Sequence, residues 1–144
     1  MKNTIASICH YAVALTSLIF GCMYLFKKEF MPYHSVAVGR SWDEVDAGMK
    51  VLILALMRAV SAGWLITAVV VAWLQWQFNK TKAGWIPLVI LVAGLVSSSV
   101  TVYATTIVRA GSEGKPPTLL GVGMMVLFLA AYFLNRRYLK KNPA

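Results

Sequence analysis

The chain has 144 residues, of which 59% are hydrophobic and 13% are charged, and its formal net charge is +9. The hydrophobic fraction exceeds the roughly 45–50% that is usual for soluble domains, which excludes an ordinary soluble fold and indicates one integral membrane domain. The positive charge does not indicate nucleic acid, because the bases stand in short blocks between long apolar runs.

Four apolar runs are each long enough to cross a hydrocarbon core of about 30 Å, which takes roughly 20 helical residues. They cover residues 4–26, 51–76, 85–108 and 118–138. Because the runs are continuous rather than alternating, they indicate helices and not membrane β-strands. We therefore predict an all-α fold, with residues 1–144 forming an antiparallel four-helix bundle in the membrane.

The first span carries both cysteines and one of the two histidines. Cys9 and Cys22 are about 20 Å apart along a helix, too far for a disulfide, and no CxxC pair supports a thiol–quinone oxidoreductase. His10 and His34 lie at different depths, so they cannot both ligate one haem in a single chain. We predict no cofactor, and a haem held by His10 across a dimer axis is the alternative.

Residues 27–50 form the one long polar loop of the chain. Ser41 followed by Glu44 fits a capping box, so we predict that the second helix begins directly after Ser41, outside the bilayer. Asp43, Glu44 and Asp46 would then lie in its first turns, where negative charge is favourable. These acids therefore have a structural explanation.

The same loop offers groups for contacts with other molecules. Pro32 is expected to end an extension of the first helix and to leave Tyr33 in a turn. His34 and the acids could ligate a metal, but their spacing is not diagnostic and capping accounts for three acids, so we predict no metal site. The candidate docking residues for a protein partner are Trp42, Asp43, Glu44 and Asp46.

Arg58 is the most informative single residue, because it lies about 10 Å into the second span, where a charge is costly. In the functional interpretation it faces the bundle interior and contacts a solute, in a small cavity lined by residues of matching depth. In the alternative it points back to the outer headgroups, because helical side chains lean toward the N-terminus. The candidate binding residues are Arg58, Tyr33, His34, Ser99, Thr101 and Tyr103.

Small residues at helical spacing predict where the helices contact one another, because close approach replaces the hydrophobic drive that lipid does not supply. The predicted contact residues are Ala59, Gly63, Gly94, Ser98, Gly121 and Gly123.

The distribution of charge predicts the orientation of the bundle. With four spans, the N-terminus, the second loop and the C-terminus share one side, which carries seven bases and no acid. Basic residues within short loops favour the cytoplasm, and the cluster within residues 136–141 decides the prediction. We expect a multi-pass protein of the cell inner (plasma) membrane with both termini in the cytoplasm.

The chain lacks the groups that most membrane chemistry needs. No acid lies in the hydrocarbon part of a span, which counts against a proton-coupled exporter, and no nucleophile elbow or phosphate loop indicates an enzyme. Our first hypothesis is an accessory, assembly or scaffold subunit that acts through helix packing and the outer loop. The alternative is a small-solute or ion conduit or binding protein that uses Arg58 and the serine–threonine face of the third span. The expected partners are the bilayer and another membrane subunit or a second copy, with no nucleic acid.

Overall fold

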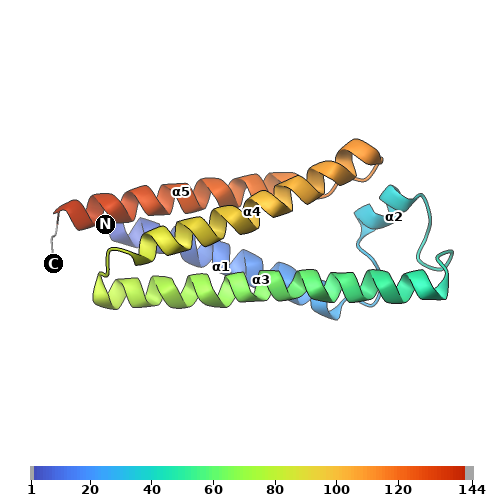
Figure 1. Cartoon of the computed structure of the whole chain (residues 1–144), viewed down its shortest axis with the longest axis horizontal. Coiled ribbons are helices and arrows are strands. Elements are labelled where there is room, and N and C mark those ends of the chain that lie inside the picture. The colour runs from blue at the N-terminus through green and yellow to red at the C-terminus, as the bar shows by residue number, and fades with distance from the viewer. Residues whose placement is uncertain (1, 142–144) are drawn as a thin grey trace.

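The computed structural model describes residues 2–141, which form helices joined by loops, with no strand among them (Figure 1). Four of the helices are long and apolar enough to cross a membrane, so the chain is a multi-pass membrane protein. The predicted all-α antiparallel bundle is confirmed. The helices are α1 (Lys2–Phe26), α2 (Pro32–Val38), α3 (Ala47–Thr81), α4 (Ile86–Gly111) and α5 (Thr118–Lys141).

The four long helices form a closed ring in which α1 packs on α3 and α5, and α4 packs on the same two helices. Both termini and the turn between α3 and α4 lie at one end of the bundle (Figure 1). We call this the basic end, because Lys80, Lys82 and residues 136–141 lie there. The opposite end, which carries α2 and the turn between α4 and α5, is called the loop end.

The half of the bundle nearest the basic end is filled by a hydrophobic core. Phe78 of α3 and Phe128 of α5 are fully buried, and Ile90 of α4 is 1% exposed. Gly94 permits this packing, because a Cβ atom there would lie 2.5 Å from the Phe128 ring. Only a residue without a side chain allows α4 to approach α5 so closely.

Three of the six predicted contact residues are confirmed, all of them between α4 and α5, and the other three are wrong. Gly94, Ser98 and Gly121 are buried, and a Cβ atom at Gly121 would lie 2.8 Å from Val102. A Cβ atom at Gly63 would meet nothing within 4 Å, and Ala59, one turn earlier on the same face of α3, is exposed as well. Small residues at helical spacing identify a helix face on which another helix can pack closely, but they do not show whether that face points into the bundle. The wrongly predicted contact residues are Ala59, Gly63 and Gly123.

A hydrogen-bonded network joins α1 to α3 inside the basic-end half. The Gln75 amide nitrogen donates to Ser7 Oγ and to Asn79 Oδ1, both at 2.9 Å. The Gln75 amide oxygen therefore accepts from His10 Nδ1, at 2.5 Å. The histidine is fully buried, and its contact is a hydrogen bond between helices, which is the common use of a histidine in a membrane bundle.

The predicted start of the second long helix was wrong. α3 begins at Ala47, where Asp46 is the N-cap and its Oδ1 accepts from the Met49 backbone N–H at 2.9 Å. Glu44 does accept from the Ser41 backbone N–H, at 2.7 Å, but this bond closes a separate turn that precedes the helix. Aspartate is among the strongest N-cap residues, so the helix starts where Asp46 can serve it.

The interpretation of Pro32 was also wrong, because it begins a helix rather than ending one. It is the first residue of α2, a position that suits proline because the first N–H of a helix has no partner within the helix. The helix ends at Gly39, whose φ of 69° lies in the left-handed region that glycine adopts easily. Residues 27–50 therefore hold a short helix that the sequence analysis did not predict.

Candidate functional site: a cavity at the loop end

A cavity of about 530 Å³ lies in the half of the bundle nearest the loop end. This volume is within the range of about 300–1,000 Å³ that is typical of small-molecule sites. All five helices contribute to its lining, which is mostly apolar. The side chains around it that the structure describes include no Lys, Arg, Asp or Glu.

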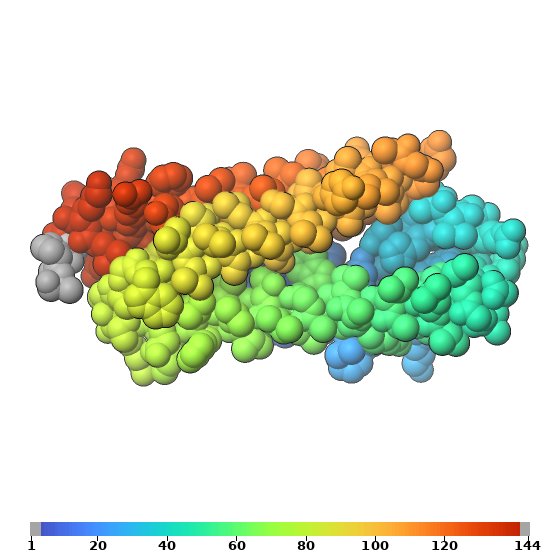
Figure 2. All heavy atoms as spheres, in the orientation of Figure 1, coloured from blue at the N-terminus to red at the C-terminus, as the bar shows by residue number. Residues whose placement is uncertain are grey.

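The cavity opens between α3 and α4. The two helices separate toward the loop end (Figure 1), and Figure 2 shows the surface hollowed between them beside α2. Leu56 and Val60 of α3 and Val100 of α4 line the cavity, yet they are 57%, 49% and 63% exposed. Because α3 and α4 are both long and apolar enough to cross a membrane, these exposed apolar side chains place the opening on the apolar side surface of the bundle.

Helix α2 forms the roof of the cavity, through Tyr33, His34, Ala37 and Val38. It packs closely against the turn between α4 and α5, since a Cβ atom at Gly114 would lie 2.8 Å from Ala37 and 2.9 Å from the Tyr33 carbonyl oxygen. The residues that precede it are anchored in a small core. The buried members of that core are Tyr24, Phe30, Met31, Val45 and Met57.

The roof carries neutral hydrogen-bonding groups. The hydroxyls of Tyr24 and Tyr33 hydrogen-bond to each other, and burial raises the pKa of Tyr33 far above its ordinary value. His34 Nδ1 accepts from the Met31 backbone N–H at 3.3 Å, so Nε2 carries the hydrogen of the neutral ring. Burial lowers the pKa of His34, which favours that neutral form.

The structure brings together three of the six predicted binding residues. Tyr33, His34 and Thr101 line the cavity, whereas Ser99 and Tyr103 lie outside its lining, and Tyr103 is 69% exposed. The prediction matched residues by depth, but residues two apart on a helix point in nearly opposite directions. Residues at the same depth as Thr101 therefore need not share its face.

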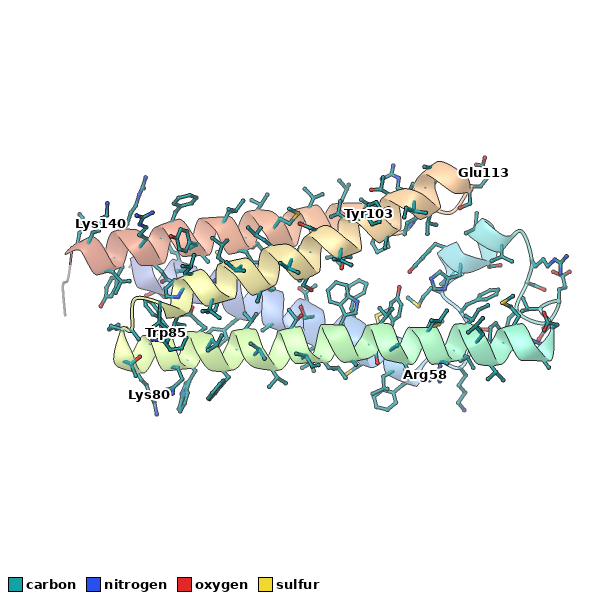
Figure 3. The ribbon with its side chains drawn as sticks, in the orientation of Figure 1. Arg58, Lys80, Trp85, Tyr103, Glu113 and Lys140 are labelled. Carbon is teal, nitrogen blue, oxygen red and sulfur yellow. The ribbon has the colours of Figure 1, made fainter. Side chains whose placement is uncertain are left out.

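Arg58, the sixth candidate, also lies outside the cavity lining. Its Nη1 donates to the Leu54 carbonyl and its Nη2 to the Lys27 carbonyl, both at 3.1 Å. Figure 3 shows the side chain on the side of α3 that is away from α4. The guanidinium thus points toward the loop end and binds the chain just after α1. A positive charge is favourable there, because the C-terminus of a helix carries a partial negative charge.

The predicted docking residues take part in the packing and turns of the loop itself. The Trp42 ring lies edge-on to the Phe30 ring, with centroids 5.0 Å apart. Lys50 Nζ lies 5.6 Å from the centroid of the Trp42 ring. Glu44 accepts from the Ser41 backbone, which lowers its pKa, and Asp46 caps α3. Asp43 is exposed. Among the described residues, no three His, Cys, Asp or Glu side chains gather as a metal site.

The cavity-lining residues that the sequence analysis did not name are mostly apolar. The Phe20 and Trp64 rings lie 5.6 Å apart and line the cavity from α1 and α3. One signal was available, because Trp64 lies in the middle of a span whereas Trp73 and Trp76 lie near its boundary. A tryptophan away from the headgroups indicates a buried wall or a ligand contact.

Comparison of the chain with protein-family models, characterised proteins and solved structures found no match.

Proposed function

We propose that this chain is a non-catalytic membrane protein that binds a lipid-soluble molecule in the loop-end cavity. The observation that carries the proposal is the combination of an uncharged, mostly apolar lining with an opening between α3 and α4. A ligand that is dissolved in the bilayer reaches such a site by lateral diffusion. A charged solute would instead lose its hydration with no opposite charge to replace it.

The packing of the other half favours binding over a conduit. A path for ions or polar solutes must continue through the bundle, but Phe78, Ile90 and Phe128 fill its basic-end half. Arg58, the residue on which the conduit hypothesis depended, is engaged with two backbone carbonyls. The accessory or scaffold role stays a prediction, because no contact in the fold bears on it.

The proposal includes an orientation. The basic end carries Lys80, Lys82 and the bases of residues 136–141, which favours the cytoplasmic side of an inner membrane. The loop end, with the cavity and α2, then lies in the outer half of the bilayer. The ligand would enter from the outer leaflet.

Native mass spectrometry of the protein, purified in mild detergent from the cells that make it, tests the proposal. Ala104 is exposed on α4 and lines the cavity, so Ala104→Trp should fill the opening and abolish a bound small-molecule mass. Ala93→Trp, on an exposed position of the same helix outside the lining, should retain it. A bound mass that persists equally in both variants would contradict the proposal.

Arg58→Leu distinguishes the proposal from the conduit hypothesis. Because Arg58 does not line the cavity, this variant should keep the bound mass that Ala104→Trp loses. Loss of the bound mass in both Arg58→Leu and Ala104→Trp would mean that Arg58 contributes to ligand binding. A second polypeptide at fixed stoichiometry, with no small molecule, would favour the accessory-subunit hypothesis instead.

A further inference from the structure

The hydrogen-bonding capacity of the cavity is concentrated in its roof. Two hydroxyl hydrogens belong to the Tyr24–Tyr33 pair, and their mutual bond uses one of them, so one O–H stays available. His34 Nε2–H is a second donor. The threonines of the wall are already engaged, since Thr101 donates to the Ser97 carbonyl at 3.0 Å and Thr105 to the Thr101 carbonyl at 2.9 Å.

These groups select the head of a ligand by charge. Both donors are neutral, and among the described residues no basic side chain lines the cavity to balance a phosphate. A phospholipid headgroup placed under α2 would be a desolvated anion without a partner, which is strongly unfavourable. A neutral oxygen acceptor, such as a ring carbonyl, can accept from an O–H and from an N–H donor, and the Tyr33 and His34 rings that carry these donors are in contact.

The walls select the rest of the ligand by shape. The roof donors stand among flat rings, because His34 lies edge-on to Tyr33, with centroids 4.2 Å apart, and to Tyr24 at 6.5 Å. Below them the lining is apolar and continues past Trp64 to the opening between α3 and α4. A flat ring fits under the roof, and an attached hydrocarbon chain can leave through the opening into lipid.

Resting on the function proposed above, we propose that the ligand is a prenylated quinone. One ring carbonyl accepts from the Tyr24–Tyr33 pair and from His34, and the apolar chain extends along the walls into the bilayer. The assignment concerns binding alone: the quinone enters and leaves the cavity in the same oxidation state, as cargo or as a regulatory ligand.

Quenching of tryptophan fluorescence by a decyl-substituted benzoquinone tests the assignment, with the full chain in phosphatidylcholine nanodiscs. Quinone dissolved in lipid quenches exposed tryptophans in proportion to its concentration, whereas a bound quinone adds a saturable component from Trp64. We expect that component in the wild-type protein and expect Trp64→Phe to remove it. Decylbenzene, which has no carbonyl, should compete only at concentrations about tenfold higher or more.

The donors are tested by a double variant, Tyr24→Phe with Tyr33→Phe, because either tyrosine alone would still have a free hydroxyl. We expect affinity for the quinone to fall about tenfold, since the apolar shape is kept and only donors are lost. Tyr103→Phe, on an exposed tyrosine outside the cavity, is the matched control and should not change affinity. If the double variant does not fold, His34→Phe removes the other donor and should weaken binding at least threefold.

Phosphatidylcholine with brominated chains separates the two proposals. If the quinone gives no saturable component, or if decylbenzene competes equally well, the quinone assignment is overturned. The proposed function still stands in that case if brominated chains give a quenching component that Trp64→Phe removes and that Ala104→Phe, which fills the opening without adding a tryptophan, prevents. If neither probe reaches Trp64, both proposals fail.

Discussion

The two halves of this bundle are built by the same four helices and are packed in opposite ways. In the basic-end half, Phe128 packs against Gly94 within a core that also includes Phe78, and a network centred on Gln75 ties α1 to α3. In the loop-end half, α3 and α4 separate around a cavity that α2 covers. One half is filled by close helix contact, and the other holds a cavity that an added helix covers at one end.

The contrast shows how a small membrane protein can keep a cavity without losing its fold. In lipid no hydrophobic drive holds helices together, so packing and hydrogen bonds must do so. Here both are concentrated in the basic-end half, where a glycine brings two helices together and a buried amide joins two others. The loop-end half can then remain open, because Gly114 and the small core around Phe30 hold its roof.

The largest effect on this contrast is expected from Gly94→Val. The new side chain would collide with the Phe128 ring, and overpacking of a filled core costs about 1–3 kcal/mol. We expect the free energy of unfolding, measured by SDS titration with circular dichroism, to fall by about 3 kcal/mol.

Gly63→Val is the matched control, because a Cβ atom at Gly63 meets nothing within 4 Å. It should change the unfolding free energy by less than about 0.5 kcal/mol, as is usual for surface substitutions. Equal losses in the two variants would mean that the effect is one of glycine in a helix and not of α4–α5 packing.

A smaller effect is expected from Gln75→Leu. It leaves the fully buried His10 Nδ1 without its acceptor and takes a donor from the half-buried Ser7 and Asn79. Such losses cost about 1–2 kcal/mol in total, because single hydrogen bonds between membrane helices average about 0.6 kcal/mol. The same SDS titration measures it, and Gln77→Leu, on a half-buried position of the same helix, should have little effect. A stabilising Gln75→Leu would show that the network serves something other than stability.

The long helices could be predicted from the sequence, because a run of about 20 apolar residues has few alternatives in a membrane. The start of α3 could not, since Ser41 and Asp46 are both good caps and tertiary packing decides between them. The helix α2 was missed for a related reason. Pro32 both ends helices and begins them, and only the contact with Gly114 shows which role it has.

The lining of the cavity was predicted in part, and the candidate residues that lie outside it were chosen for one reason. Tyr33, His34 and Thr101 were found because they are polar and lie at the right depth, but depth says nothing about the face of a helix. Tyr103 met the same criteria of polarity and depth, but its side chain is exposed on the outside of the bundle. The apolar members, such as Phe20 and Trp64, are of the same residue types as lipid-facing positions. A cavity for a lipid-soluble molecule has a composition that resembles the surface around it.

The smallest expected effect is a dependence of stability on pH that belongs to the loop end. Burial lowers the pKa of His34 in the folded protein below its ordinary value of 6.5. Well above pH 6.5 the ring is neutral in both states and its contribution is fully present. As the pH falls below 6.5 the unfolded chain takes up a proton before the folded protein does, so stability is lost until the lowered pKa is passed. The rings facing it belong to Tyr24, Tyr33 and Phe30, which offer no charge to offset this.

We expect thermal unfolding at pH 5 and pH 8 to differ less in His34→Gln than in the wild-type protein. If both proteins lose the same stability, the titrating group is not His34.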